Sequence, residues 1–346
     1  MKVLMLSIDH TILDTGSPAN TRLSDYRALV DELKVVLPPV PPRSRYYYLW
    51  DGYKECSQIL RDWKGNRIVV TSQDGATNIL ALLLSMRFKF GLEVQIHTDI
   101  FSVYFRKESF NNYLRLFGYW LGAKRARSIR VVSKRIARGL MKNWHVLGKK
   151  ITILPIFVNK ERWQESRAGV NLHREYPEFD RIILMASRIT VEKNFPLALK
   201  AFALVRERYP NTGLVIVGDG PLRQEIKGQN VVVRPWEDNI SSLYRSSDIF
   251  LLASNYEGYG LTLIEAALSG TPIVTTDVGV VGEIIKAHNA LIAPVGDARR
   301  LAQHIIFLFQ NDKARIMMQE RLLKVVNKLP DKETYLKLLK LSWQKC

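Results

Sequence analysis

Residues 249–276 read IFLLASNYEGYGLTLIEAALSGTPIVTT. A short apolar run is followed by a turn containing Gly258 and Gly260, then by a longer apolar segment, and finally by a second short apolar run. Runs of four or five apolar residues are typical of strands buried on both faces, whereas the middle segment is long enough for a helix. We therefore interpret the stretch as a strand–helix–strand unit of a parallel sheet.

The same alternation runs through most of the 346 residues. In the first half, strands are expected at 2–8, 67–71, 92–97, 129–132 and 151–154, and helices at 78–88 and 111–123. In the second half, strands are expected at 182–186, 213–217, 231–233, 249–253, 272–275 and 290–293, and helices at 196–208, 261–269 and 298–309. This pattern predicts an α/β fold of doubly wound sheets, with ligands bound at the carboxyl ends of strands.

Length and a lapse in the pattern indicate two domains. A chain of 346 residues suits two domains of ordinary size, and the stretch between residues 160 and 180 is polar and charged. We expect an N-terminal domain over 1–162, a linker over 163–180 and a C-terminal domain over 181–330. Residues 331–346 are expected to form a helix that packs back onto the N-terminal domain, with one side made by Tyr335, Leu338, Leu339 and Ser342.

The composition indicates a globular protein, with 47% hydrophobic and 24% charged residues. The first nine residues meet charges too soon for a signal peptide, and no run of about 18 apolar residues predicts a spanning helix. The two cysteines, Cys56 and Cys346, lie far apart and lack the spacing of a disulfide framework or a metal site. We therefore expect a cytoplasmic protein.

Most of the excess charge lies in one segment. The net charge is +18, and residues 104–150 hold thirteen Lys and Arg residues and a single acid, Glu108. Basic residues beside an aromatic-rich helix suit an anionic membrane surface. A solvated face and a nucleic-acid patch are the alternatives, but no nucleic-acid-binding motif accompanies the charge. We expect peripheral binding to the inner face of the cell membrane through residues 104–150, and no nucleic-acid partner.

Two cations stand five residues apart in the loop that follows the predicted strand 182–186. Arg188 can contact a phosphate through two N–H groups, and Lys193 can reach the same diphosphate as a mobile point charge. An isolated pair of this kind is more often solvated, with Glu192 as a surface partner. Gly218, after the next strand, permits a tight turn and close backbone approach, although a plain strand-to-helix turn explains it equally well.

The turn at 258–260 opens a helix whose first N–H groups and dipole form an anion site. Glu257 lies just before this turn, and Glu265 lies inside the helix among apolar neighbours. A lone acid in such surroundings is unexpected unless it faces a ligand. With a phosphate at the helix start, one carboxylate is available to the hydroxyls of a sugar and the other to those of a ribose.

Several motifs in this half, taken together and in order, resemble those of the retaining glycosyltransferase family 4, the "glycosyl transferases group 1". They are R-x4-K-N at 188–194, V-G-D-G-P at 217–221, S-D-I-F at 247–250, and the segment from Glu257 to Ala266, and they lie within residues 182–310. The resemblance implies the GT-B fold, in which two Rossmann-like domains face each other across a deep cleft. It also implies that the first domain binds an acceptor and the second a nucleotide-sugar donor.

The resemblance assigns roles residue by residue. Arg188 and Lys193 hold the donor diphosphate and stabilise the leaving phosphate, Glu257 approaches the donor sugar, and Glu265 binds the ribose hydroxyls. The turn contributes backbone contacts to the diphosphate or sugar through Gly258, Tyr259, Gly260 and Leu261. Tyr259 stands where the family usually has Phe, and Ser187 where it often has Gly.

In the first half the resemblance covers fewer residues. His97 resembles the strand-end histidine that faces the donor sugar, although a lone histidine at a strand end is more often a structural hydrogen-bonding group. Gly16 is the single glycine in the loop where the family usually carries a pair that touches the donor phosphate.

The expected function is retaining transfer of a sugar from a UDP- or GDP-sugar to a lipid-linked or envelope polysaccharide acceptor. Catalysis would be mainly electrostatic, without a cofactor or metal, because no carboxylate pair has the spacing of metal ligands. The alternatives are a non-catalytic GT-B protein that binds nucleotide sugars, a GT-B sugar epimerase, for which more histidines are expected, and a basic nucleic-acid-binding protein.

Overall fold

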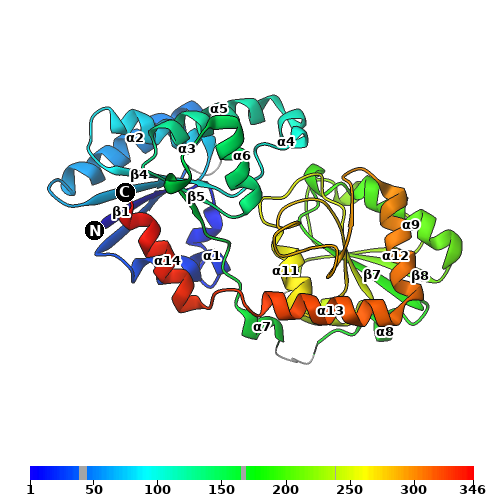
Figure 1. The fold of residues 1–346 in the computed structure, drawn as a ribbon. Coiled ribbons are helices and arrows are strands. Elements are labelled where there is room, and N and C mark those ends of the chain that lie inside the picture. The colour runs from blue at the N-terminus through cyan, green and yellow to red at the C-terminus, as the bar shows by residue number, and fades with distance from the viewer. Residues whose placement is uncertain (39–44, 165–168, 238) are drawn as a thin grey trace. The chain divides into compact units, whose positions relative to one another are not determined.

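The structure is a computed structural model that describes residues 1–38, 45–164, 169–237 and 239–346. The chain divides into two compact units, the first formed by Met1–Pro155 with Lys332–Cys346 and the second by Ile156–Asp331 (Figure 1). Each unit contains one six-stranded sheet, and all pairings within both sheets are parallel. The prediction of an α/β fold with doubly wound sheets is confirmed. Of the expected linker, residues 165–168 lie outside the described residues.

The sheet of the first unit has the strand order β2-β1-β3-β4-β5-β6. Its strands are β1 (Lys2–Leu6), β2 (Glu32–Val36), β3 (Ile68–Ser72), β4 (Gly91–Ile96), β5 (Ser128–Val131) and β6 (Ile151–Ile153). Its α-helices are α1 (Pro18–Arg27), α2 (Arg45–Asp62), α3 (Gly75–Ser85), α4 (Val103–Glu108), α5 (Phe110–Arg125), α6 (Lys134–Trp144) and α14 (Lys332–Gln344), with 3₁₀ turns η1 (His10–Leu13) and η2 (Gly148–Lys150). Helices α2, α3 and α5 lie on one side of the sheet and α1 and α14 on the other (Figure 1).

Strand β2 is a strand that the sequence analysis missed. Among the described strands it pairs with β1 alone and forms an edge of the sheet. Three of its five residues are partly exposed, and its sequence, ELKVV, carries two charges. The charges have partners at this edge, since Lys2 Nζ lies 2.9 Å from Glu32 Oε2. An edge strand therefore lacks the continuous apolar run that identified the central strands.

Helix α14 packs on the first unit through a buried polar network. Its Ser342 hydroxyl donates to Glu93 of β4, and Arg130 of β5 donates to the Tyr335 hydroxyl at 3.3 Å. Burial raises the pKa of the Glu93 carboxyl, and the nearby Arg130 charge partly offsets that rise. Leu338, expected on the packed side, is 38% exposed, whereas Trp343 is completely buried. Helical geometry places positions 335, 339, 342 and 343 on one face, and position 338 at its margin.

The second sheet has the strand order β12-β11-β10-β7-β8-β9. Its strands are β7 (Arg181–Ala186), β8 (Thr212–Val217), β9 (Val231–Arg234), β10 (Ile249–Leu252), β11 (Ile273–Thr276) and β12 (Leu291–Ala293). Its α-helices are α7 (Lys160–Gln164), α8 (Leu172–Glu175), α9 (Phe195–Arg208), α10 (Ile240–Arg245), α11 (Leu261–Leu268), α12 (Ala298–Gln310) and α13 (Asp312–Val326), with 3₁₀ turns η3 (Val191–Lys193) and η4 (Arg223–Glu225).

The four central strands of this sheet, β11, β10, β7 and β8, are buried on both faces. Alternate residues such as Ile183, Leu214 and Leu251 join one cluster with the apolar sides of α9 and α12. The intervening residues face the helices on the other side of the sheet. Phe250 is an example, since its ring centroid lies 5.2 Å from that of Tyr244 in α10. Burial on both faces explains why these strands read as continuous apolar runs and why their predicted positions agree with the structure.

The described part of the chain has no helix that is both long enough and apolar enough to cross a bilayer.

Candidate functional site

An ion pair joins the two loops that the sequence analysis singled out. Lys193 Nζ lies 2.6 Å from Glu257 Oε1, and the two side chains are only 13% and 12% exposed. The same carboxylate oxygen accepts a hydrogen bond of 2.8 Å from the Ser254 hydroxyl. Lys193 follows β7 and Glu257 follows β10, and these strands are neighbours in the sheet. The parallel sheet therefore brings both loops to its carboxyl edge.

Two asparagines tie the same loops together a second time. The Asn194 amide donates to Asn255 Oδ1 at 2.8 Å, and the Asn255 N–H donates to the Glu192 carbonyl at 2.8 Å. Asn194 has a left-handed backbone, with φ of 51°, and its side-chain oxygen accepts from the Leu197 N–H at the start of α9. Asparagine tolerates this conformation better than most residues and also caps helices well. The asparagine of R-x4-K-N thus sets where the loop ends.

Arg188 differs from Lys193 in its surroundings. Its side chain is 80% exposed, and its nearest carboxylate is Glu192 Oε1 at 3.5 Å. Glu192 is the surface partner that the sequence analysis considered for Arg188 and Lys193 if they bind no ligand. At that distance and exposure the contact contributes little to stability, so the guanidinium keeps the freedom to turn toward a ligand.

Glycines hold the loop that carries Arg188. A Cβ atom at Gly218 would lie 1.9 Å from the Ser187 carbonyl oxygen, and one at Gly220 would lie 2.3 Å from the Ile189 carbonyl oxygen. The Ile189 N–H also donates to the Asp219 carbonyl at 2.8 Å. The close approach that the sequence analysis expected at Gly218 is therefore made with the Arg188 loop itself. Its assignment to donor binding stays a prediction.

The start of α11 has the features of an anion site. Gly260, at φ of 83°, precedes the helix and has no side chain to cap the first N–H groups, and Leu261 and Thr262 are only half-buried. Exposed N–H groups at the positive end of a helix dipole favour an anion. Gly258 and Tyr259 are buried beneath this turn.

The turn at 258–260 is held in place by the loop at 277–280, which the sequence analysis did not identify. The Val280 N–H donates to the Tyr259 carbonyl at 2.9 Å, and a Cβ at Gly279 would lie 2.4 Å from that same oxygen. Gly279 has φ of 56°. The Tyr259 ring points inward and is 2% exposed, and burial with the nearby charge of Glu283 raises the pKa of its phenol. Only the Asp-Val-Gly sequence after β11 could have indicated this turn.

Glu265 is a buried carboxylate with a hydrogen-bond donor. The residue is 8% exposed and its Oε2 accepts from the Tyr244 hydroxyl at 3.1 Å. Burial, and then the charge of Glu265, raises the pKa of Tyr244 well above its usual value, so the phenol keeps its proton. A carboxylate fixed in this way can accept from further hydroxyl groups with little loss of side-chain entropy.

In the first unit, His97 ends a row of polar side chains on β4. Gln95 Nε2 donates to Glu93 Oε1 at 2.8 Å, which leaves Gln95 Oε1 to face His97 Nε2 at 3.3 Å. Because that oxygen can only accept, His97 Nε2 carries the proton and Nδ1 is the acceptor. Burial, aided by the charges of Arg130 and Arg22, lowers the pKa of His97 to about 3.

Gly16 lies on the surface between η1 and α1, with φ of 85° and no atom within 4 Å of a Cβ built on it. The next residue, Ser17, caps α1. The other predicted site residues apart from Gly16 and His97 belong to the second unit.

Within the described residues, no group of three or more His, Cys, Asp or Glu side chains could hold a metal ion. That the protein requires no metal stays a prediction.

Comparison with known proteins gives a family match over the second unit. Residues 173–325 match the model described as "Glycosyl transferases group 1". Among curated proteins, the chain is 29% identical over 200 residues to N-acetyl-alpha-D-glucosaminyl L-malate synthase of Bacillus anthracis, covering 54% of this chain and 52% of that protein. It is 30% identical over 161 residues to alpha-monoglucosyldiacylglycerol synthase of Streptococcus pneumoniae, covering 42% and 36%. The chain thus spans about half, or less, of the length of these relatives.

Solved structures match both units. Sucrose-phosphate synthase from Thermosynechococcus elongatus superposes with a TM-score of 0.79 at 15% identity, covering 99% of this chain and 98% of that one. Anabaena HepE in complex with UDP-glucose gives a TM-score of 0.79 at 14% identity, with both chains fully covered. At this identity the likeness shows the fold, which matches that of GT-B glycosyltransferase structures.

The contact of Gly279 with the Tyr259 carbonyl predicts that two glycine substitutions lower stability by different amounts. Gly279→Ala should lower the free energy of unfolding by about 2–4 kcal/mol, because it adds a backbone clash to the strain of positive φ. Gly270→Ala is the matched control, since Gly270 also has positive φ, at 73°, but open space around its Cβ position. Its cost should stay near 1 kcal/mol. Equal costs in urea unfolding would show that the contact with Tyr259 is unimportant.

The hydrogen bonds of His97 predict its charge state and tautomer. Between about pH 5 and pH 8 the imidazole should remain neutral with the proton on Nε2, because burial disfavours the charged ring and Gln95 Oε1 requires a donor. Two-dimensional ¹H–¹⁵N correlation spectra of the histidine rings would measure both properties. The exposed His145 provides an internal reference. A His97 ring that becomes charged near pH 6.5 would contradict this assignment.

Proposed function

We propose that this chain, whose residues 173–325 match the model for glycosyl transferases group 1, transfers a sugar from a nucleotide-diphosphate sugar to an acceptor. The observation that carries the proposal is the cluster at the carboxyl edge of the second sheet. There, Lys193 is paired with Glu257 beside the uncapped start of α11. A diphosphate requires cations and N–H donors, and a sugar requires a carboxylate that accepts from hydroxyls. The site offers both within two adjoining loops.

The Lys193–Glu257 ion pair explains how the site holds its charges before the donor arrives. Two partly buried charges are tolerable because they neutralise each other and because Ser254 also donates to the carboxylate. When the donor binds, we propose that its diphosphate becomes the partner of Lys193. A sugar hydroxyl then donates to Glu257 in place of the ammonium. Each protein charge exchanges one partner for another, so neither is left desolvated and unpaired.

Catalysis in this proposal is electrostatic. Bond cleavage at the sugar leaves negative charge on the departing diphosphate, and we propose that Lys193, Arg188 and the α11 N–H groups stabilise that charge. Such groups act most strongly when they are already oriented, and the two asparagines and the glycine contacts fix the backbone of the loops that carry them. We propose a retaining reaction in which the leaving phosphate accepts the acceptor's proton, with no separate protein base and no metal.

We propose a UDP-sugar as donor. The structurally similar HepE was crystallised with UDP-glucose, and Glu265 is held by Tyr244 as a fixed acceptor for the two ribose hydroxyls. His97 serves as a neutral hydrogen-bonding group for a sugar hydroxyl, with Nδ1 as acceptor. We propose that Gly16 contacts the donor phosphate.

We propose a lipid-linked acceptor, or one at a membrane surface, reached from the first unit. One relative is named a monoglucosyldiacylglycerol synthase. In this unit, α5 packs on α3 through small residues, since a Cβ at Gly118 would lie 2.2 Å from the Gly75 carbonyl oxygen. Its outer side instead carries large apolar residues, with Phe110 77% and Phe117 54% exposed. A helix with its large apolar residues on the outside suits an apolar partner such as a bilayer interface.

The charge around α5 suits an anionic bilayer. Two cations of the segment 104–150 are structural, because Arg130 is buried and Arg115 Nε lies 2.9 Å from Asp74 Oδ2. Most of the others are exposed: Arg106, Lys107, Lys124, Arg125, Arg127, Lys134, Arg138, Lys142 and Lys149. Each cation near an anionic surface contributes about 1 kcal/mol, so a few suffice for peripheral binding to the inner face of the cell membrane.

The first test of the function removes the ammonium at the site. Lys193→Ala should reduce kcat for sugar transfer, or for hydrolysis of a UDP-sugar, by about 100- to 1000-fold, the usual loss when a donor to a developing anion is removed. Lys200→Ala is the control, because Lys200 is exposed on α9 next to this loop. Unchanged turnover in Lys193→Ala with an intact fold would rule out the catalytic assignment. Donor binding without turnover in the wild-type protein would favour the non-catalytic alternative.

A second test concerns the membrane surface. The double variant Phe110→Ser/Phe117→Ser should bind vesicles of phosphatidylglycerol and phosphatidylcholine with an affinity at least about tenfold lower than that of the wild-type protein. The reason is that insertion of each ring contributes on the order of 1 kcal/mol to binding. Ile316→Ser/Met317→Ser, on exposed positions of α13 in the second unit, is the matched control. Co-sedimentation at low salt measures the effect. Equal binding by the two variants would exclude α5 as the contact surface.

A further inference from the structure

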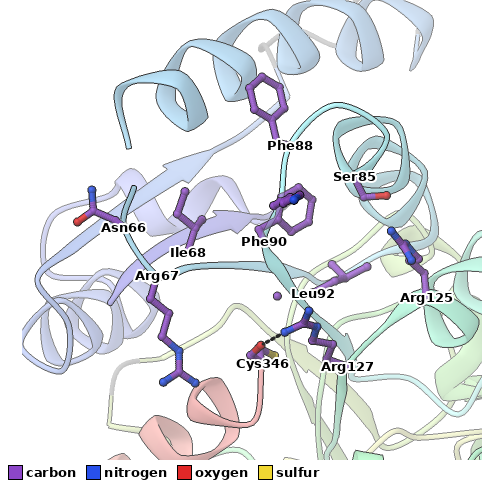
Figure 2. A pocket seen from close by; sticks show the side chains of 12 residues that line it. Asn66, Arg67, Ile68, Ser85, Phe88, Phe90, Leu92, Arg125, Arg127 and Cys346 are labelled. Atoms are coloured by element: carbon purple, nitrogen blue, oxygen red, sulfur yellow. Dashed lines mark hydrogen bonds between the residues drawn. The ribbon is translucent and has the colours of Figure 1, made fainter. Parts of the chain in front are cut away.

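A cavity of about 630 Å³ opens at the edge of the first sheet where the strands begin. It is lined by the residues that lead into β3, β4 and β5 and by Cys346, just beyond the end of α14 (Figure 2). His97 follows the opposite end of β4, and a strand of six residues spans roughly 17 Å. The cavity is thus distinct from the edge that carries His97, and all its lining residues belong to the first unit.

The lining is strongly cationic. It includes the side chains of Arg67, Lys89, Arg125 and Arg127, and it includes no Asp or Glu. In the described parts of the chain, none of these four cations forms an ion pair with an Asp or Glu side chain. Four like charges around one cavity repel one another, and the Cys346 main-chain oxygen that Arg127 contacts offsets this repulsion only in part, so an anion that enters the cavity relieves it.

Two of the arginines are held in place by the end of the chain's last helix. Arg127 Nη1 donates to the Cys346 carbonyl at 2.9 Å, and Arg67 Nη2 donates to the Gln344 carbonyl at 2.5 Å. Gly91 allows this arrangement, because a Cβ there would lie 2.5 Å from Cys346 Cβ. Figure 2 shows Arg67 and Arg127 on either side of Cys346. These contacts orient two guanidinium groups before any ligand is present.

The cavity also has an apolar part. Phe88 and Phe90 line it together with Ile68 and Leu92 (Figure 2). Both phenylalanines are partly exposed, so their rings can contact a ligand. Cavities of this volume are typical of small-molecule sites, in which apolar walls bury the ligand and a few polar groups orient it.

We propose that this cavity binds a phosphate-bearing ligand, with the phosphate among Arg67, Lys89, Arg125 and Arg127 and an apolar or aromatic portion against Phe88 and Phe90. Arginine matches phosphate geometry through paired N–H donors, and four cations around one cavity suit a group that carries up to two negative charges. The ligand is either a phospholipid headgroup or a soluble phosphate ester. The site does not depend on the proposed transferase activity.

The variant Lys89→Gln/Arg125→Gln tests the site with little risk to folding. Both side chains are exposed and neither has a hydrogen bond or ion pair within the described structure. Arg138→Gln/Lys142→Gln removes the same charge from exposed positions of α6 outside the cavity and serves as control. A third variant, Lys193→Ala, separates the cavity from the donor cluster.

Titration calorimetry on the full chain would compare three probes: inorganic phosphate, phenyl phosphate, and dihexanoyl phosphatidylglycerol below its micellar concentration. We expect phenyl phosphate or the lipid to bind more tightly than inorganic phosphate, and the tighter of the two identifies the source of the ligand. Affinity should fall about tenfold or more in Lys89→Gln/Arg125→Gln and stay unchanged in the α6 control.

Three results would overturn the proposal. The first is that neither organic phosphate binds more tightly than inorganic phosphate. The second is an equal loss of affinity in the α6 control, which would mean that only net charge matters. The third is a loss in Lys193→Ala with retention in Lys89→Gln/Arg125→Gln, which would place the binding at the donor cluster.

Discussion

The parallel pairing of β7 with β10 is the constraint on which the candidate site depends. These strands are far apart in sequence, and because they are neighbours in the sheet, the loops after them meet at one edge. Lys193 and Glu257 then lie within 2.6 Å, and Asn194 and Asn255 within 2.8 Å. A change of strand order would separate all four residues. The site is therefore a property of the sheet's topology as much as of its side chains.

Backbone contacts then fix the loops more tightly than side chains alone could. Gly218 and Gly220 let one loop lie against the carbonyls next to Arg188, and Gly279 does the same beneath the turn at Tyr259. At each position a Cβ would meet a backbone oxygen within 2.4 Å, a contact that cannot relax by rotating a side chain. Rigid placement of this kind is what an electrostatic site requires, since its groups must be oriented before charge develops.

The sequence predicted the central strands well because strands buried on both faces read as apolar runs, as residues 249–252 do. It missed β2, since an edge strand can carry Glu32 and Lys34. It also identified Lys193 and Glu257 separately but not their contact, which depends on strand order. The sequence analysis also did not identify the contacts of Gly279 or the row of polar side chains from Glu93 to His97. The Gly279 contact arises where two segments distant in sequence meet, and no local pattern encodes such a meeting. The row from Glu93 to His97 lies on alternate residues of one strand, and the burial that distinguishes it depends on the surrounding fold.

The return of α14 to the first unit has a consequence for biosynthesis. The second unit is one continuous segment, Ile156–Asp331, whereas the first is completed only by Lys332–Cys346. While the chain is being made, Glu93 lacks its partner Ser342 and Arg130 lacks its partner Tyr335, because α14 supplies both. The later segment can therefore reach its native state before the earlier one, contrary to the usual order in which domains fold as they leave the ribosome.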